Sequence, residues 1–277
     1  MRYAQEWSLR NDPDDSGVVE CPWGHATTPL VYLETGPKPV MLPESVRSCW
    51  PGLAVDGPLS GGARNDIRSG QLDGVRVVIR HSRRNPNSRS WEWHLLRHLQ
   101  ECGIHLPVFI PSSAGDLDVD GWHVYEYVEG SHPEPKDPRI ADALAAVHAV
   151  TEGWPQRPGS ASSIDLPELL VGGDIDLTAM PTELANQIID AWRRARTPSP
   201  TCVVHGDAHA RNAIIDKQGR CVLLDWDEAR VDQPHYDLPV GPAELRANVA
   251  WEIATCWIPE PDYARSLVPD FTGSASP

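Results

Sequence analysis

The chain has 277 residues, which is enough for one large domain or for two smaller domains with cores of their own. It carries 24 Lys and Arg against 39 Asp and Glu, a formal net charge of −15, and so acidic a chain is repelled by nucleic-acid phosphates and by anionic lipid. Length and charge therefore argue against nucleic acid or a membrane surface as a partner.

The N-terminal segment MRYAQEWSLRNDPDD lacks the basic and then apolar pattern of a secretory signal. No stretch of the sequence approaches the roughly 20 apolar residues that a membrane helix needs. Six cysteines are scattered without a CxxC pair, which is typical of small core residues in a reducing compartment. We expect a cytoplasmic protein, either a monomer or a homodimer.

The first half of the chain predicts a small lobe rich in strands. Residues 1–50 are polar and rich in proline, and we expect an N-terminal extension that packs on this lobe. Residues 53–81 are typical of two or more strands, with the cluster SGGARN at 60–65 and a hairpin signal at Asp73–Gly74. A helix is expected over 88–103, since apolar side chains recur there every three or four residues, and a short strand over 121–130.

The second half predicts a larger, mainly helical lobe. Apolar periodicity favours helices over 138–150, 181–196 and 243–257. Between the last two helices lie two short apolar runs, 201–204 and 221–224, and each opens directly onto a cluster of polar residues. The expected fold is therefore α+β with two lobes, and the polar clusters lie at their junction.

These polar clusters are the part of the sequence that indicates chemistry. Polar side chains that follow buried strands lie at strand ends, where clefts usually form. Carboxylate and amide oxygens suit Mg²⁺, and an aspartate that is not bound to the metal can accept a proton from an attacking hydroxyl. Asp207 is the candidate for that aspartate. The first cluster contains His205, Gly206, Asp207, His209, Arg211 and Asn212, and the second contains Asp225 and Asp227.

The pattern H-G-D-x-H-x-x-N, followed about a dozen residues later by D-W-D, resembles the catalytic segment of the aminoglycoside phosphotransferase family. That family of antibiotic kinases is related to the eukaryotic-type protein kinases, and the resemblance extends more loosely from about residue 53 to about residue 240. It implies a two-lobed protein-kinase-like fold. The extension would span 1–50, the nucleotide-binding lobe 51–128, and the catalytic and acceptor-binding lobe 129–277.

The resemblance also implies a role for each polar residue. Asp207 would be the catalytic base that orients the acceptor hydroxyl, while Asn212 and Asp225 would bind Mg²⁺ beside the phosphates of ATP. His205 would brace the loop. The backbone of the segment that ends in Glu126, Tyr127 and Val128 would contact adenine. GTP stays open as an alternative donor.

Two further features of the small lobe fit this resemblance. The cluster 60–65, with Gly61 and Gly62, would cover the phosphates through backbone N–H groups, although no GK[ST] follows and the segment is not a P-loop. Protein kinases carry a lysine on the third strand, paired with a helix glutamate. This chain has no lysine between residues 39 and 135, so Arg80 must supply the cation, with Glu92 as its partner.

We therefore expect an ATP-dependent kinase that phosphorylates a hydroxyl of a small molecule, most plausibly an antibiotic that is inactivated in this way and to which the enzyme confers resistance. Phosphoryl transfer needs charge neutralisation and alignment more than covalent help, and the predicted residues supply both. The net charge favours a cationic acceptor, such as an aminoglycoside or a basic cyclic peptide. A nucleoside, a macrolide or a metabolic small molecule stays open as the acceptor.

Two other classes of function are alternatives to the kinase hypothesis. The histidines and aspartates of the two polar clusters also suit a metal-dependent hydrolase, but that reading leaves Gly61, Gly62, Arg80 and Glu92 unexplained. A non-catalytic kinase-like module would not need a base and two metal ligands. The roles of His209 and Asp227 stay open. So does the role of the later acids, which suit either a solvated face or a pocket for a polycationic acceptor: Glu228, Asp232, Asp237, Glu244, Glu252, Glu260 and Asp262.

Overall fold

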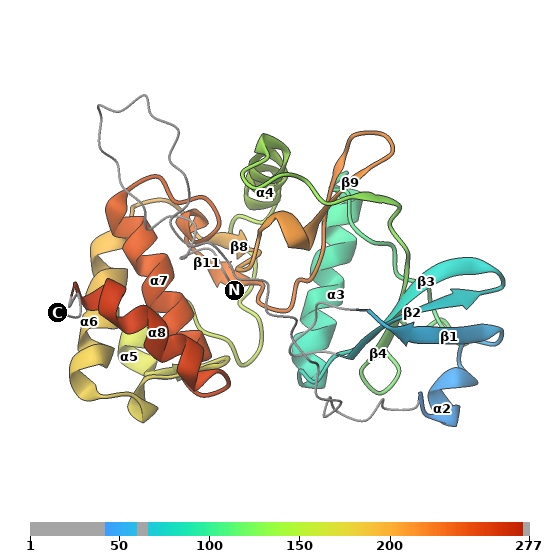
Figure 1. Ribbon diagram of the computed structural model, residues 1–277, viewed down its shortest axis with the longest axis horizontal. Helices are drawn as coiled ribbons and strands as arrows, with labels where there is room; N and C mark the ends of the chain where they lie inside the picture. The colour runs from blue at the N-terminus through green and yellow to red at the C-terminus, as the bar shows by residue number, and fades with distance from the viewer. Residues whose placement is uncertain (1–41, 60–65, 274–277) are drawn as a thin grey trace, which may run out of the picture.

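The computed structural model describes residues 42–59 and 66–273. Figure 1 shows two lobes side by side along the long axis of the molecule, with the sheet β1–β4 at one end and helices α5 to α8 at the other. The α+β architecture with two lobes that the sequence predicts is confirmed. The glycine cluster 60–65 lies outside the described residues, as do residues 1–41 of the expected extension.

The small lobe is built on one antiparallel sheet in the order β1-β2-β3-β4. Its strands are β1 (Leu53–Pro58), β2 (Asp66–Leu72), β3 (Val75–His81) and β4 (Trp122–Glu126). The predicted hairpin at Asp73–Gly74 is confirmed, since both residues have positive φ, 51° and 81°, as a tight two-residue turn requires. Strand β3 occupies the centre, where Arg80 pairs with Ile67 of β2 and with His123 of β4.

Residues 42–50 pack against this sheet. They include the short helix α2 (Glu44–Arg47), and Val46 and Trp50 are buried in one apolar cluster with Val77 and Val124. The indole of Trp50 donates a hydrogen bond to the carbonyl of Ile110 at 3.0 Å. This end of the expected extension is therefore joined to the small lobe by buried contacts.

Helix α3 (Pro86–Glu101) joins the two lobes. It begins two residues before the predicted start, because the side chain of Asn85 accepts a hydrogen bond from the N–H of Ser88 at 2.9 Å and Pro86 occupies the first turn. Its apolar face, with Leu95 and Leu99, is buried in a cluster that also contains Leu144 and Leu223 of the large lobe. The helix therefore belongs to the core of the large lobe although it follows the sheet in the chain.

The large lobe contains the three predicted helices within one residue of their expected bounds. They are α4 (Pro138–Val150), α6 (Thr182–Ala195) and α7 (Pro242–Cys256). Helix α8 (Pro261–Thr272), which the sequence analysis does not predict, packs on α7 and buries Leu267 and Phe271. The remaining elements are short: β5 (Gly130–Ser131), α5 (Leu166–Leu169), β6 (Val171–Gly172), β7 (Ile175–Asp176), β8 (Cys202–Val204), β9 (Ala213–Asp216), β10 (Cys221–Leu223) and β11 (Arg230–Asp232).

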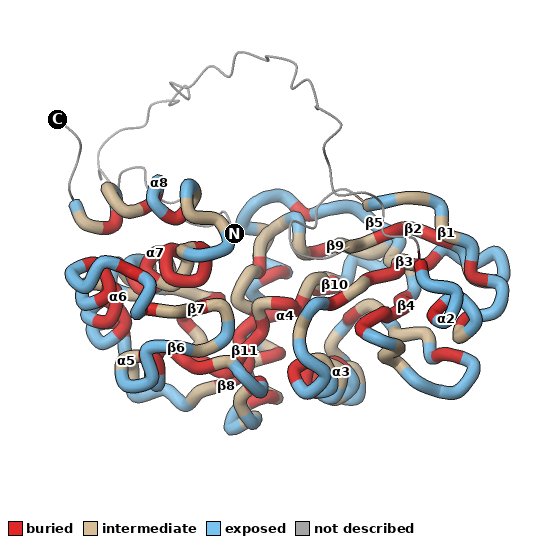
Figure 2. Tube along the Cα trace, turned by 90° about the horizontal axis from the view of Figure 1, so that it is seen from below, coloured by how far each residue is buried: buried red, intermediate tan, exposed pale blue. Residues whose placement is uncertain are grey.

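Figure 2 shows how burial follows this arrangement, with β8 and β11 buried toward the middle of the molecule and further buried residues in α6 and α7. The expectation that the cysteines are core residues is correct for Cys202 and Cys256 and wrong for Cys102, which is exposed just after α3. Among the described helices, none is both long enough and apolar enough to cross a membrane.

Candidate active site

The loop that follows β8 is held by a buried carboxylate. The N–H groups of His205 and Gly206 donate to the two oxygens of Asp237 at 2.8 and 2.9 Å, and Nε2 of His148 lies 2.8 Å from one of them. Burial alone would raise the pKa of Asp237, but the hydrogen bonds from His148 and Gly206 outweigh it and hold the pKa below its usual value. Asp237 is therefore an ionised anchor for the loop.

This result bears on two of the acids whose role the sequence leaves open. Asp232 and Asp237 are fully buried and hydrogen-bonded, so they do not belong to a solvated face of acids. The sequence does not predict this burial, because each aspartate follows a short apolar or irregular segment with no helical periodicity. His148, which as a lone histidine on a helix suggests packing, is the polar partner of Asp237.

Gly206 is required by the close passage of two chain segments. Its φ is +81°, and a Cβ atom built there would lie 2.7 Å from the carbonyl oxygen of Glu228. Only glycine fits a left-handed position with backbone so near. The turn delivers Asp207 to the surface of a cavity, with about a fifth of its side chain exposed.

Asp207 and Asn212, five residues apart, are brought together. Nδ2 of Asn212 donates to Oδ2 of Asp207 at 3.0 Å and to the carbonyl of Asp207 at 2.9 Å. The amide oxygen of Asn212 is thereby directed away from Asp207. His209 accepts a hydrogen bond from the N–H of Arg211 at 3.1 Å, and its Nε2 lies 3.7 Å from Asp207 Oδ1. Its ring therefore caps the short turn beside Asp207.

Arg80 is buried at the end of β3 among three carboxylates. Its Nη1 donates to Glu92 Oε1 at 3.0 Å, so the two residues expected to pair are in contact. Its Nη2 donates to Asp227 Oδ1 at 2.9 Å and lies 3.5 Å from Asp225 Oδ1. Arg84 adds a second cation near Asp227, and the two arginines outweigh burial, so the pKa of Asp227 is lowered. Asp227 is thus a buried partner of two arginines.

Arg157 is a functional candidate that sequence reasoning misses. Its side chain is almost fully buried, and its Nη2 donates to Glu92 Oε2 at 2.6 Å while Nε donates to Ser88 at 2.6 Å. Its Nη1 bonds the carbonyls of three residues that follow Asp225, namely Trp226, Asp227 and Ala229. The residue lies in the proline-rich segment WPQRPGS, which carries no pattern that would have indicated these contacts.

Asp225 has the features of an incomplete ligand site. Its φ is +57°, which is uncommon for a residue other than glycine, and its Oδ1 is buried without a hydrogen bond. Burial raises the pKa of Asp225 above its usual value although Arg80 opposes the shift. An orphaned, buried carboxylate oxygen is the donor that a hard cation such as Mg²⁺ requires, so Asp225 fits a magnesium site.

Trp226 and His205 pack against each other and support the segment that contains Asp225. Trp226 is buried with its ring centroid 4.7 Å from that of His205, and His205 Nε2 lies 2.8 Å from the carbonyl of Leu224. The contact with Leu224 ties the loop after β8 to the segment after β10. The geometry of His205 is therefore that of a brace between the two polar clusters.

The three residues expected to contact adenine follow the end of β4. The N–H of Glu126 donates to the carbonyl of Val108 at 2.9 Å, and that of Tyr127 to the carbonyl of Arg76 at 3.2 Å. Within the part of the chain that the structure describes, the N–H of Val128 has no backbone acceptor. Val128 is therefore the residue of the three whose N–H is open to a base.

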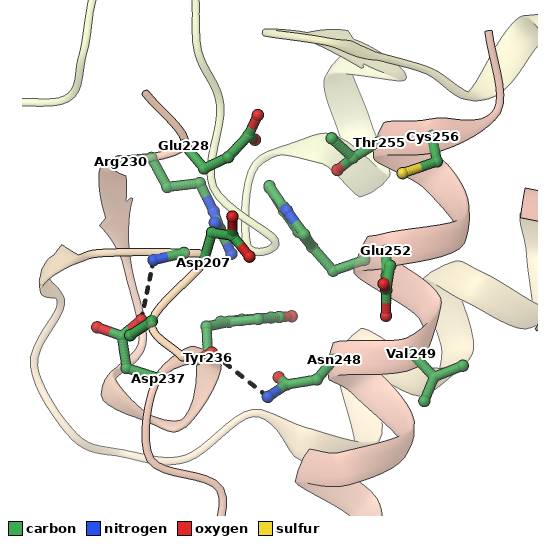
Figure 3. Close-up of a pocket in the computed structure, with 13 residues that line it drawn as sticks. Asp207, Glu228, Arg230, Tyr236, Asp237, Asn248, Val249, Glu252, Thr255 and Cys256 are labelled. Atoms are coloured by element: carbon green, nitrogen blue, oxygen red, sulfur yellow. Dashed lines mark hydrogen bonds between the residues drawn. The ribbon is translucent and has the colours of Figure 1, made fainter. Parts of the chain in front are cut away.

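A cavity of about 70 Å³ lies beside Asp207, between the loop after β8 and helix α7. Figure 3 shows the carboxylate of Asp207 and the side chain of Arg230 on one side of the cavity, with Glu252 on α7 opposite. The cavity is lined by acids, aromatic rings and small polar residues: Gly206, Asp207, Ala208, Glu228, Arg230, Tyr236, Asp237, Asn248, Val249, Trp251, Glu252, Thr255 and Cys256.

Comparison with protein families agrees with this geometry. The phosphotransferase enzyme family, APH, matches residues 57–257, which span β1 to the end of α7 and contain every site residue described above. The chain belongs to this family. A comparison of the sequence with curated proteins found no match.

Solved structures share the fold of this APH family chain at low sequence identity. Aminoglycoside phosphotransferase APH(4)-Ia has a TM-score of 0.59 at 14% identity, over 84% of this chain and 98% of that one. Spectinomycin phosphotransferase APH(9)-Ia, in complex with ADP and spectinomycin, has a TM-score of 0.55 at 12% identity, over 81% and 87%. Choline kinase LicA from Streptococcus pneumoniae has a TM-score of 0.55 at 15% identity, over 83% and 96%. The protein-kinase-like fold expected from the sequence is confirmed.

The structure does not favour the hydrolase alternative. Across residues 42–59 and 66–273, no three His, Cys, Asp or Glu side chains gather as a metal-binding group. The Nε2 atom of His205 lies 2.8 Å from the carbonyl of Leu224, and its buried Nδ1 makes no hydrogen bond with a described residue. The donors present are single carboxylates and an amide, as a magnesium-nucleotide site requires.

Proposed function

We propose that this phosphotransferase transfers the γ-phosphoryl group of ATP to a hydroxyl of a small cationic molecule, with an antibiotic as the first candidate. The observation that carries the proposal is the placement of Asp207 on the wall of a cavity, hydrogen-bonded to Asn212, with Asp225 presented by the neighbouring segment. Family membership supports the same reaction class. GTP is the alternative donor.

Asp207 would act on the acceptor hydroxyl. Its carboxylate faces the cavity, and the hydrogen bond from Asn212 to Oδ2 fixes its orientation. A fixed carboxylate accepts a hydrogen bond from the hydroxyl, aligns the oxygen for attack and takes its proton as the bond to phosphorus forms. The anchored loop at Asp237 limits the motion of Asp207, which keeps this alignment precise enough for transfer.

Asp225 and the amide oxygen of Asn212 are the residues that would hold Mg²⁺. When bound, the metal neutralises charge on the phosphates of the nucleotide. Arg80, which Glu92 and Asp227 hold in place, would direct its guanidinium edge toward the same phosphates. Gly61 and Gly62 would cover the phosphates with backbone N–H groups, and the segment Glu126–Val128 would contact the base.

Two features support a cationic acceptor. Glu228 and Glu252 line the cavity beside Asp207, together with the ring of Trp251, and a net charge of −15 attracts cations at long range. The solved structures described above include enzymes named for aminoglycosides and for choline, which are both cationic. A metabolic amino alcohol is therefore the second candidate class of acceptor.

ADP release measured across a panel of acceptors tests this proposal. The panel contains aminoglycosides, basic cyclic peptides, nucleosides, macrolides and amino alcohols, each with ATP and with GTP. We expect release with at least one cationic member. Binding of MgADP without release from any member would contradict the assignment of the acceptor class.

The role of Asp207 is tested with Asp207→Asn. Loss of the base should lower kcat by about 10²- to 10⁴-fold while the Kd for MgADP stays unchanged, because the carboxylate acts on the acceptor and not on the nucleotide. Asp142→Asn, an exposed aspartate on α4, is the matched control. Retained turnover in Asp207→Asn would show that another group is the base.

A further inference from the structure

Arg230 is a buried arginine in the wall of the cavity beside Asp207. It begins β11, is 3% exposed, and lines the cavity together with Glu228 and Trp251. Its guanidinium carbon lies 3.4 Å from the ring centroid of Trp251 and 4.9 Å from that of Tyr236. Figure 3 shows the side chain directed toward Asp207. The ring of Trp251 covers one face of the guanidinium, and Tyr236 packs beside both.

Only one edge of this guanidinium is used. Nε donates to Asp232 Oδ2 at 3.1 Å, whereas Nη1 and Nη2 are buried and make no hydrogen bond with any described residue. A guanidinium has five N–H donors, so four remain without a partner. A buried donor without an acceptor costs free energy, and a charged one costs more, so an unsatisfied group of this kind in a native site calls for a ligand.

The environment holds Arg230 in this geometry. Asp232 is fully buried, and it accepts hydrogen bonds from the N–H and hydroxyl of Ser163 at 3.0 and 2.7 Å and from the N–H of Gln233 at 2.9 Å. The carboxylate therefore cannot turn to satisfy the other nitrogens. The stacked ring of Trp251 fixes the plane of the guanidinium. Such a rigid, planar fork is suited to bidentate binding of an oxyanion.

The cavity contains further unsatisfied polar atoms. Asn248 Oδ1 and Thr255 Oγ1, which come from the same helix α7, are buried and make no hydrogen bond with the described residues. An apolar occupant would leave them and Arg230 without partners. The cavity measures about 70 Å³, less than the roughly 150 Å³ of a cavity that holds benzene, so its occupant is a small polar molecule or one end of a larger one.

We propose that Arg230 binds a carboxylate of the acceptor, so that the acceptor carries an anionic group close to the hydroxyl that is phosphorylated. The inference rests on the proposed function, since it assigns the substrate of that site. With Glu228 and Glu252 in the same cavity, the acceptor class becomes a hydroxy amino acid or a molecule that presents one. Aminoglycosides, which have amino groups but no carboxylate, fit this class less well.

The test compares acceptors that differ only by a carboxylate. The pairs are serine and ethanolamine, threonine and 1-aminopropan-2-ol, and homoserine and 3-aminopropan-1-ol, each titrated into the full chain without nucleotide. We expect the carboxylate member of at least one pair to bind about 10- to 100-fold more tightly, as a charged hydrogen bond to a fixed guanidinium predicts. No binding of any carboxylate member, or ratios within about twofold in every pair, would overturn the proposal.

Variants assign the effect to Arg230. Arg230→Met should bring the ratio of the two affinities in each pair close to one, and Arg230→Lys should keep part of the preference for the carboxylate member. Arg220 is a half-exposed arginine on the β9–β10 turn, and Arg220→Met should keep the whole preference. Because Arg230→Met leaves Asp232 buried without its cation, the double variant Arg230→Met, Asp232→Asn provides a folded alternative. An unchanged ratio in the double variant and in Arg230→Lys would overturn the proposal.

A second experiment distinguishes a carboxylate from a phosphate as the ligand of Arg230. It also distinguishes the carboxylate proposal from the proposed kinase function. Inorganic phosphate and MgATP are titrated into the same variants. If Arg230→Lys weakens these ligands and leaves the carboxylate ratio intact, Arg230 serves the phosphoryl group and the acceptor proposal is wrong. Binding of MgADP to the wild type tests the kinase function alone, so its failure would not be confused with failure of the carboxylate site.

Discussion

At the scale of single residues, Asp237 is the side chain on which the geometry of the loop depends most directly. It is wholly buried, and three donors from two segments converge on it. Because the pKa of the folded carboxyl is held below its usual value, the ionised form stabilises the fold. That stabilisation is fully present above the unfolded pKa of about 3.9 and is lost as pH falls through the lower folded pKa.

We expect Asp237→Asn to destabilise the protein by about 3–5 kcal/mol at pH 7, since the substitution removes the charge that satisfies the buried donors. The difference between wild type and variant should narrow as pH falls below about 4, because the unfolded carboxyl takes up a proton there while the folded one stays ionised to a lower pH. Urea unfolding at a series of pH values measures both effects. A difference that stays constant with pH would contradict the assignment of Asp237 as an ionised anchor.

Some of the site residues can be predicted from the sequence, and others cannot. Asp207, Asn212 and Asp225 stand in dense polar clusters directly after apolar strands, and this contrast is visible in the printed sequence. Arg157 and Arg230 are single arginines in irregular or short segments. Arg157 meets Glu92 across 65 positions of the chain, and Arg230 is held by ring stacking on Trp251. Contacts of that range leave no periodicity, so only the folded chain shows them.

At the scale of elements, capping and periodicity account for most of the agreement between the predicted helices and those in the structure. Helix α4 has the predicted bounds because Asp137 caps it and Pro138 occupies its first turn. Helix α8 is not predicted because Pro269 interrupts its pattern and two further prolines flank its start. Packing of Leu267 and Phe271 on α7 stabilises it despite this low propensity.

The cap of α3 provides a test at this scale. Asn85→Ala removes the acceptor for the N–H of Ser88, and we expect a loss of about 1 kcal/mol in the free energy of unfolding. Asn87→Ala, an exposed position in the first turn of the same helix, is the control and should change the stability by less than about 0.5 kcal/mol. Equal losses in the two variants would show that the cap contributes nothing specific. Urea midpoints supply the measurement.

At the scale of the whole molecule, ion pairs connect the sheet to the helical lobe. Leu95 and Leu99 of α3 are fully buried in the cluster that contains Leu144, Val203 and Leu223, whereas Val77 and Ile79 of the sheet belong to a cluster of their own. Arg80 of the sheet binds Glu92 of α3 and Asp227 of the large lobe. Because separating the lobes would leave these buried charges without partners, we expect the chain to unfold as one cooperative unit.

We expect Leu99→Ala to lower the free energy of unfolding by about 2–5 kcal/mol, because the substitution leaves a cavity in the core between α3 and the large lobe. Urea unfolding followed by tryptophan fluorescence and by loss of MgADP binding should give coincident transitions in wild type and variant. Leu169→Ala, at an exposed position of α5, serves as the control. Two separate transitions in either protein would contradict unfolding as one cooperative unit.

The double attachment of Glu92 has a consequence for regulation. In protein kinases, displacement of the helix that carries the corresponding glutamate breaks its ion pair and switches the enzyme off. Here one oxygen of Glu92 is bound by Arg80 and the other by Arg157, which is itself fastened to carbonyls of the segment after Asp225. Moving the helix would strand several buried charges at once. The contacts therefore fasten α3, the sheet and the segment after Asp225 in one assembled arrangement.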